Sequence, residues 1–347
     1  MPEQTAQFDP GAMGDKIREF GVQILRGWKI GSSGRALPQD FNAVVFSGMG
    51  GSAIAGDVIL SMFRDALTVP FIVNRSYTVP GFVSEKTLFI ASSYSGNTEE
   101  TLSALNAALD RGACIAAVTS GGEVLSMCSD RDFPVYSMPP GYPPRSALGF
   151  PVGILLAVFS RSGLIPTQEA DVQNAVSFLA GRQNEFSHES GPCAVLAESI
   201  LGRLPFVYGA EGGTDVAALR WKAQFNENSK VHAVSGIFSE MNHNEIMGWS
   251  RHRSTGPFFD TLSALFLRVP GGNDRNSIRM DITRDIIQEQ GGAVHDIAAQ
   301  GSTKMEQLLY LISYGDWTSY HLARLQGVDP TEIPAISTLK NKLSKVK

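Results

Sequence analysis

The sequence predicts an α/β protein with two parallel sheets, each flanked by helices. The chain of 347 residues is longer than one ordinary domain, so about two domains are expected. Short runs rich in valine and isoleucine alternate with helical stretches, which is typical of a buried parallel sheet. A similar glycine-rich turn followed by a helix occurs once in each half. We therefore expect an N-terminal domain over residues 1–160 and a C-terminal domain over residues 161–347.

The N-terminal half shows this alternation most clearly. It opens with a helical pattern from Met13 to Gly27 and then repeats the order strand, turn and helix. Because the strands are continuous apolar runs, both faces of their sheet should be covered. Strands are expected at residues 42–48, 68–74, 87–93 and 114–120, and helices at 52–63, 97–112 and 123–128.

The second half repeats the pattern after a helical connection that runs from about Gly149 to about Ser199. Ligands of open parallel sheets bind at the carboxyl ends of the strands, so two such units would enclose a cleft. The alternative is that the glycines only close tight turns between strand and helix. The expected elements are a strand at 204–209, a glycine loop at 211–215, a helix at 216–228, a strand at 264–271 and a helix at 277–291.

Charge, cysteine content and hydropathy exclude several kinds of binding partner and of stabilising cross-link. The formal net charge is −5, so the chain offers no basic field to nucleic acid. Cys114, Cys128 and Cys193 lack C-x-x-C spacing and indicate neither a disulfide framework nor a zinc site. The first residues lack a signal-peptide pattern, and the longest apolar run is too short to span a bilayer. We expect a soluble cytoplasmic protein without nucleic-acid or membrane partners.

The most informative motif is S-S-Y-S-G-N-T-E-E-T, which lies between a predicted strand and a predicted helix. Ser93, Ser95 and Thr98 place hydroxyl groups near the first N–H groups of the helix, where the helix dipole favours an anion. We interpret this segment as a phosphate-binding loop. Gly51 and Ser52 follow the neighbouring strand and are expected beside it.

Two alternatives compete with this interpretation. Asn97 with Glu100 three residues later also suits an ordinary helix cap, although a cap needs one polar group and not a run of hydroxyls. Residues 48–53 spell G-x-G-x-x-A after a strand, which matches a dinucleotide-binding fingerprint. The next strand ends in Asn74 and Arg75 where an acidic residue is expected for NAD, although an arginine suits NADP.

The second half supplies candidates for chemistry. Glu227 ends a predicted helix, where the negative end of the helix dipole favours proton uptake and therefore suits a general base. The alternative is an ordinary exposed carboxylate at a helix end. His243 follows in the polar segment E-M-N-H-N-E-I. The six histidines show no metal-ligand spacing, so neither a metal nor another cofactor is predicted.

Six motifs in order along the chain together resemble the bifunctional phosphoglucose/phosphomannose isomerases, whose chains contain two sugar-isomerase (SIS) domains. The resemblance spans almost the whole sequence, which makes it far more specific than any one motif. It implies an α/β fold with two SIS domains, each a parallel sheet flanked by helices. The motifs are G-M-G-G-S-A-I-A-G-D, S-S-Y-S-G-N-T-E-E-T, P-P-R-S-A, A-L-R-W-K-A-Q-F-N-E-N-S-K, E-M-N-H-N-E-I and I-P-A-I-S-T-L-K-N-K-L.

The resemblance also implies roles for individual residues in interconverting glucose 6-phosphate or mannose 6-phosphate with fructose 6-phosphate. Glu227 corresponds to the general base, His243 to the histidine that assists ring opening, and Arg145 to the arginine that stabilises the intermediate. Lys340 corresponds to the family's C-terminal lysine. Similar enzymes are homodimers in which the histidine crosses to the partner's site. The phosphate-binding residues are Gly51, Ser52, Ser93, Ser95 and Thr98.

The chain departs from the family pattern at one position. Members of the family can carry a threonine before the proline of the C-terminal motif, in a role linked to mannose phosphate, whereas Ile333 precedes Pro334 here. Other hypotheses stay open from the sequence: another SIS-type sugar-phosphate isomerase, a non-catalytic sugar-phosphate sensor, or an NADP-dependent reductase. Without the resemblance, Arg145 and Lys340 would be taken for surface residues.

Overall fold

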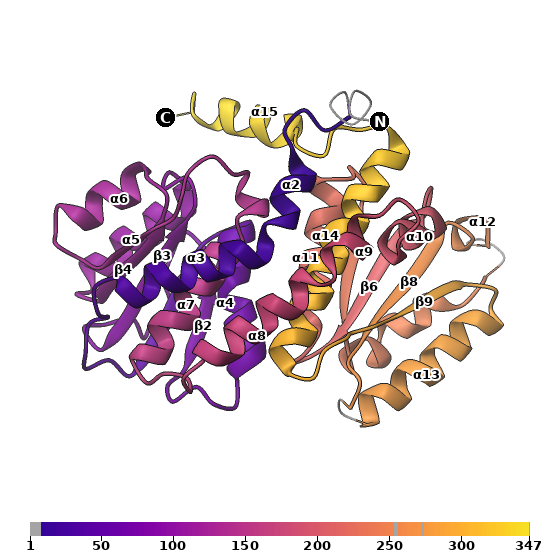
Figure 1. Ribbon diagram of the computed structural model, residues 1–347, viewed down its shortest axis with the longest axis horizontal. Coiled ribbons are helices and arrows are strands. Elements are labelled where there is room, and N and C mark those ends of the chain that lie inside the picture. The colour runs from indigo at the N-terminus through magenta and orange to yellow at the C-terminus, as the bar shows by residue number, and fades with distance from the viewer. Residues whose placement is uncertain (1–7, 253–255, 272–273, 347) are drawn as a thin grey trace.

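The structure is a computed structural model that describes residues 8–252, 256–271 and 274–346, and it contains two parallel sheets enclosed by helices (Figure 1). The predicted α/β class with two parallel sheets is confirmed. Among the described residues, no helix combines the length and the apolar character that a membrane span requires.

The first sheet has five parallel strands in the order β2-β1-β3-β4-β5. Every residue of β1 and β3 is buried, as continuous apolar runs predict. The strands are β1 (Ala43–Ser47), β2 (Phe71–Asn74), β3 (Thr87–Ser93), β4 (Cys114–Thr119) and β5 (Val135–Ser137). The surrounding helices are α3 (Phe20–Ser33), α4 (Gly50–Phe63), α5 (Glu99–Asp110), α6 (Gly122–Ser129) and α7 (Gly149–Arg161).

The second sheet has four parallel strands in the order β7-β6-β8-β9. Its strands are β6 (Leu204–Ala210), β7 (Val234–Phe238), β8 (Leu262–Arg268) and β9 (Ala293–Ala298). Its main helices are α11 (Asp215–Glu227), α13 (Asp274–Glu289) and α14 (Lys304–Gln326), with the short α12 (Gly256–Phe259). The helices α8 (Glu169–Ala180), α9 (Gln183–Ser187) and α10 (Pro192–Ser199) connect the two halves, and α2 (Met13–Arg18) and α15 (Pro334–Leu343) lie near the chain ends.

Three short 3₁₀ segments complete the described elements that matter for the site. They are η1 (Pro144–Ser146), which precedes α7, and η2 (Glu240–His243) and η3 (Glu245–Trp249), which follow β7. Both halves thus present loops at the carboxyl ends of their strands, where open parallel sheets bind ligands.

Several element boundaries differ from those predicted. The first helix is divided at Glu19 into α2 and α3, and α3 continues past Gly27 to Ser33. The strand expected at 68–74 begins only at Phe71, because Pro70 before it has no N–H to donate to a neighbouring strand. The strands β5, β7 and β9 and the long helix α14 were not predicted. These three strands form sheet edges, where a strand needs no continuous apolar run.

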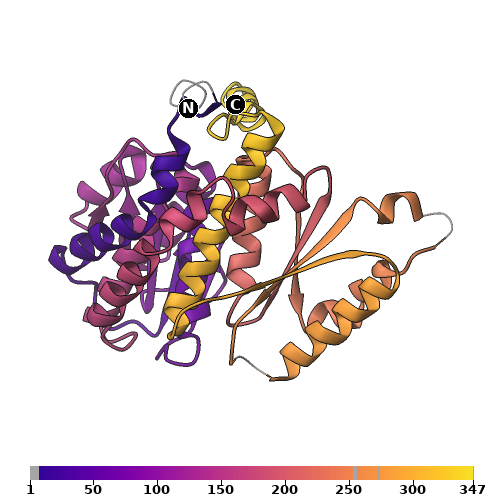
Figure 2. The same ribbon diagram turned by 45° about the vertical axis from the view of Figure 1, so that its right-hand side comes forward.

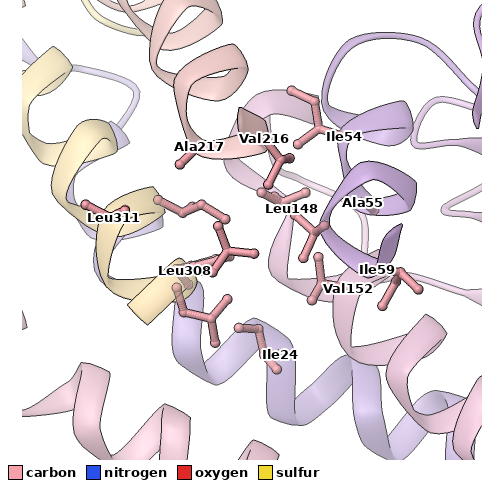
Figure 3. Packing of buried hydrophobic residues seen from close by; sticks show 14 of the residues in the cluster. Ile24, Ile54, Ala55, Ile59, Leu148, Val152, Val216, Ala217, Leu308 and Leu311 are labelled. Atoms are coloured by element: carbon pink, nitrogen blue, oxygen red, sulfur yellow. The ribbon is translucent and has the colours of Figure 1, made fainter. Parts of the chain in front are cut away.

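The two halves share one hydrophobic core. A single cluster of buried side chains takes in α3, α4 and α7 from the first half and α11 and α14 from the second. Figure 3 shows Ile54 of α4 beside Val216 of α11, with Leu148 and Val152 of the first half between α4 and Leu308 of α14. The helix α14 runs between the two halves in both ribbon views, most clearly in Figure 2. The second half is therefore packed directly against the first and is not connected to it by a linker alone.

Close approach of α3 and α7 depends on glycine. A methyl group at Gly27 would overlap the Phe150 carbonyl oxygen, and one at Gly153 would overlap the Ile24 carbonyl oxygen. Both obstacles are backbone atoms, which cannot turn aside as a side chain can. Some of the 35 glycines of this chain therefore serve helix packing and not ligand binding.

We expect Gly153→Ala to lower the free energy of unfolding by about 1–3 kcal/mol, because it forces α3 away from α7. Chemical denaturation followed by circular dichroism measures the loss. The matched control is Gly81→Ala, since a methyl group at Gly81 meets nothing within 4 Å. Equal stability of the two variants would contradict this account of the helix crossing.

Candidate active site

The hydroxyl loop between β3 and α5 is organised by its own side chains. Ser93 Oγ lies 2.9 Å from Thr98 Oγ1 and also accepts the Gly96 N–H at 3.0 Å. Ser95 Oγ accepts the Asn97 N–H at 3.3 Å. Ser93 is buried under the loop, whereas Ser95 is exposed on it. The three predicted phosphate-binding hydroxyls therefore lie on one loop that folds back on itself.

The helix-capping alternative does not describe this loop. Thr98 is the N-cap residue of α5, and it makes no side-chain hydrogen bond to the first turn. The Asn97 side chain instead accepts the Glu123 N–H of α6 through Oδ1 at 3.0 Å, which joins this loop to the next one. The start of α5 is thus left without a side-chain cap, which is the condition that suits an anion.

Ser52 links the first turn of α4, which follows β1, to the hydroxyl loop. Its Oγ accepts the Tyr94 N–H at 3.2 Å, and its carbonyl oxygen accepts from Ser92 Oγ at 3.1 Å. On the other side, a methyl group at Gly51 would come within 3.0 Å of the Pro144 carbonyl oxygen. The two predicted residues Gly51 and Ser52 therefore lie between the hydroxyl loop and η1, which carries Arg145.

Arg145 is buried, with only 3% of its surface exposed, in contrast to the surface position that sequence alone suggests. Its Nε donates to Asn228 Oδ1 at 2.7 Å, and its Nη2 donates to the carbonyl oxygens of Pro330 and Thr331 at 2.5 and 2.9 Å. Its Nη1 lies 3.5 Å from Glu227 Oε2. Burial lowers the pKa of this guanidinium from its ordinary value, and the Glu227 carboxylate opposes that lowering.

Glu227 ends α11 as predicted, and it borders a cavity between the two halves. Its side chain is 28% exposed. The cavity has a volume of about 350 Å³ and is lined by residues of α4, the end of β2, one face of α11 and the start of α15. They are Gly50, Ile54, Arg75, Leu219, Lys222, Ala223, Asn226, Glu227 and Ile336. A carboxylate with a buried cation at one side and an open cavity at the other is placed to exchange a proton with a ligand.

Lys340 lies on α15, in which no residue is buried. Ile336 of the same helix lines the cavity at Glu227. Residues four positions apart share one face of a helix, so Lys340 lies one turn beyond Ile336 on the face that borders the cavity. The structure therefore places Lys340 near the rim of the cavity and not against Glu227.

Glu227 lies near the amino ends of the strands of the second sheet, whereas His243 lies near their carboxyl ends. The chain leaves α11 at Glu227, and β7 begins close by, since the Ala233 N–H donates to Asn226 Oδ1 at 3.1 Å. The five residues of β7 then span roughly 16 Å before η2 begins. His243 is exposed at that far end. Within one chain, the structure does not bring the two residues together.

Several residues of the site were missed by sequence reasoning. Asn228 is fully buried and holds Arg145, although its position next to Glu227 suggested no such role. Arg75, which the sequence suggested only as a partner for NADP, instead lines the cavity and pairs with Asp57, whose pKa is raised by burial against the opposing effect of Arg75. Arg220 donates to the Arg145 carbonyl oxygen at 2.9 Å. Their partners lie far away in the chain, so no local spacing could have revealed them.

Comparison with known proteins identifies the family of this chain. Residues 189–343 match the family described as bacterial phospho-glucose isomerase C-terminal SIS domain. A bifunctional phosphoglucose/phosphomannose isomerase from Caldicellulosiruptor bescii is 38% identical over 96% of this chain and 100% of its own length. The chain belongs to the bifunctional phosphoglucose/phosphomannose isomerase family. A second member, from Thermoplasma acidophilum, is 37% identical over 88% of this chain and 90% of its own length.

Solved structures agree with the fold of this phosphoglucose/phosphomannose isomerase family member. Tagatose-6-phosphate ketose/aldose isomerase from Escherichia coli superposes with a TM-score of 0.69 at 16% identity, covering 93% of this chain and 96% of that one. At this identity the likeness concerns the fold alone. It supports the predicted SIS architecture, whereas the domain boundaries at residues 160 and 161 remain a prediction.

Gly96 is the residue on which the shape of the hydroxyl loop depends. It has φ +71°, and a methyl group there would overlap the Gly121 carbonyl oxygen. We expect Gly96→Ala to weaken the binding of inorganic phosphate at least tenfold, as measured by calorimetric titration. The control is Gly112→Ala, which has φ +72° but open space around it and therefore carries the backbone strain without the overlap. A similar phosphate affinity in both variants would contradict the assignment of this loop.

Proposed function

We propose that this protein is an isomerase that interconverts glucose 6-phosphate, and also mannose 6-phosphate, with fructose 6-phosphate. The observation that carries the proposal is the Glu227 carboxylate 3.5 Å from the buried Arg145 guanidinium, beside a cavity between the halves. A base next to a fixed cation is the arrangement that proton transfer beside a carbonyl group requires. The names of the two relatives described above support the same substrates.

The reaction needs one proton to leave carbon 2 of the open-chain aldose phosphate and one to arrive at carbon 1. Glu227 takes the proton from carbon 2, the C–H electron pair forms the bond between carbons 1 and 2, and the carbonyl electron pair moves to oxygen. Arg145 stabilises the enediolate that results. Glu227 then protonates carbon 1, and the proton on the carbon 2 hydroxyl passes to the carbon 1 oxygen, which leaves a ketose.

The phosphate group occupies the hydroxyl loop in this proposal. Ser93, Ser95 and Thr98 supply hydroxyl donors, and the uncapped start of α5 supplies backbone N–H groups and the positive end of its dipole. Gly51 and Ser52 lie between this loop and Arg145, so a bound sugar phosphate extends from the loop toward the Glu227 cavity. A local cradle of this kind holds an anion although the whole chain is acidic.

Ring opening is assigned to His243 and Lys340, and it requires a second copy of the chain. His243 and Glu227 lie at opposite ends of the strand β7, so His243 of the same chain does not reach the cavity. We infer a homodimer in which each His243 serves the partner's site, while Lys340 acts from the α15 side of its own cavity. The cytoplasmic location of the enzyme remains a prediction.

Glu227→Gln tests the assignment of the base. We expect it to bind the three sugar phosphates as the wild type does and to lose about 10²- to 10⁴-fold in kcat, because the amide cannot accept the proton. A coupled assay with glucose 6-phosphate, mannose 6-phosphate and fructose 6-phosphate as alternative substrates measures this. Wild-type protein that turns over none of the three would refute the proposed function. A Glu227→Gln variant with full activity would refute only the role of Glu227.

The shared site makes a separate prediction about mixed dimers. Glu227→Gln and His243→Ala homodimers should each be nearly inactive. When the two are unfolded and refolded together, half of the dimers are mixed, and each mixed dimer contains one site with both native residues. We expect recovery of roughly a quarter of wild-type activity. No recovery, with mixed dimers verified by mass spectrometry, would place both residues in the same chain's site.

A further inference from the structure

The Arg145 side chain is held by groups that the isomerase reaction itself does not use. Asn228 accepts from Nε, and the carbonyl oxygens of Pro330 and Thr331 accept from Nη2. These contacts leave Nη1 turned toward Glu227 Oε2, at 3.5 Å. A free arginine and carboxylate usually close to about 2.7–2.9 Å in a direct hydrogen bond. The Arg145–Glu227 pair is therefore longer than a direct hydrogen bond.

Asn228 is suited to this task because its side-chain amide forms one hydrogen bond through its oxygen and another through its nitrogen. It is fully buried directly after the last residue of α11. An arginine has donors only, so the amide oxygen must face Arg145 and the amide nitrogen must face the other way. The nitrogen donates to Ser319 Oγ of α14 at 2.9 Å, and Ser319 Oγ donates in turn to the Asp316 carbonyl oxygen at 2.7 Å. Asn228 therefore connects Arg145 of the first half to α14 of the second.

The backbone of Arg145 is fixed by a second buried group. Arg220 Nη2 donates to the Arg145 carbonyl oxygen at 2.9 Å. The Arg220 guanidinium is itself held in a bidentate pair with Asp316, with Nε–Oδ1 and Nη2–Oδ2 distances of 2.9 and 2.6 Å. Since the backbone is held this way, the remaining freedom of Arg145 lies in its side-chain torsions. Asn228 is the side chain that restrains those torsions at Nε.

We propose that Asn228 is a positioning residue of the isomerase: it sets the plane of the Arg145 guanidinium so that Nη1 faces Glu227 without closing on it. This inference rests on the proposed function and deepens it. Without the acceptor at Nε, the guanidinium turns toward Glu227 and forms a direct ion pair. The base is then neutralised and the cation is drawn away from the place where the enediolate forms.

Other charged groups lie near Glu227, and substitution of Asn228 would leave their contacts unchanged. Arg75 and Lys222 line the cavity. Lys230 donates to the Glu227 carbonyl oxygen at 2.9 Å and lies near Asp329 and Glu332. None of these contacts uses the Asn228 side chain. A shift in the pH profile of an Asn228 variant therefore reports on Arg145.

The first experiment compares Asn228→Ala with Ser229→Ala. Ser229 is the next residue, is also fully buried, and donates to the Ser319 carbonyl oxygen at 2.7 Å, but it does not contact Arg145. We expect Asn228→Ala to lower kcat about 10- to 100-fold with little change in KM, since a small displacement of a catalytic group costs that much. The acidic limb of its kcat/KM profile should move to lower pH. Ser229→Ala should keep the wild-type kcat and profile at similar thermal stability.

A double-mutant cycle shows whether Asn228 acts through Arg145. Lysine lacks the Nε donor, so Arg145→Lys already breaks this contact. In the Arg145→Lys variant, we expect the additional change Asn228→Ala to lower kcat by less than about threefold. The same change in the wild type should lower kcat by a larger factor. If the double variant loses kcat by the product of the two single-variant factors, the two residues act independently and the proposal is overturned. Equal kcat in Asn228→Ala and Ser229→Ala would also overturn it.

Two further measurements test the role of Asn228 even if Asn228→Ala does not fold or the proposed function is wrong. In Asn228→Asp the new side chain has the shape of asparagine but places a negative charge against Arg145, and we expect kcat to fall at least tenfold. An unchanged wild-type kcat would overturn the proposal.

The crystal structure of Asn228→Ala, or of Asn228→Asp if the first does not fold, tests the geometry without turnover. In Asn228→Ala the Nη1–Oε2 distance should shorten to a direct hydrogen bond, and in Asn228→Asp the guanidinium should rotate toward the introduced carboxylate. An unmoved guanidinium would overturn the proposal even if the wild type were inactive on every sugar phosphate.

Discussion

The buried pair between Arg220 of α11 and Asp316 of α14 is the interaction on which the site depends. Both side chains lie almost wholly out of solvent, where an ion pair is tolerated only with complete hydrogen bonding. The bidentate geometry and the additional bond to the Arg145 carbonyl oxygen satisfy this condition. Removal of one partner would leave an unpaired charge in the core, which typically costs about 3–5 kcal/mol, or at least about a fifth of the stability of an ordinary domain. The pair therefore fixes two helices of the second half against the 3₁₀ turn of the first.

The elements predicted correctly from sequence are those in which local pattern and tertiary environment agree. The strands β1 and β3 are apolar throughout because both faces of their sheet are covered, and the loops that follow them carry glycine and hydroxyl residues. Two edge strands of the second sheet gave no such pattern: β7 contains Gly236, and β9 contains His295 and Asp296. A residue at a sheet edge needs fewer apolar neighbours, so its sequence resembles that of a loop.

The candidate site divides in the same way. The hydroxyl loop could be predicted because its residues are consecutive and its function follows from a helix start. The burial of Arg145 could not be predicted, because the groups that bind it come from α11, from Asn228 just after α11 and from the segment before α15, between 75 and 186 residues away in the chain. The motif resemblance supplied the identity of Arg145 and Glu227, but only the packing of the two halves explains why they lie next to each other.

The core that runs through both halves has a consequence for how this chain can evolve. Two related units on one chain are free to diverge, and only the first has the hydroxyl loop while the second carries Glu227. Their helices α4, α7, α11 and α14 nevertheless fill one another's apolar surface. Neither unit can be exchanged for a foreign copy without rebuilding that surface. Each half therefore depends on the other to cover its apolar surface.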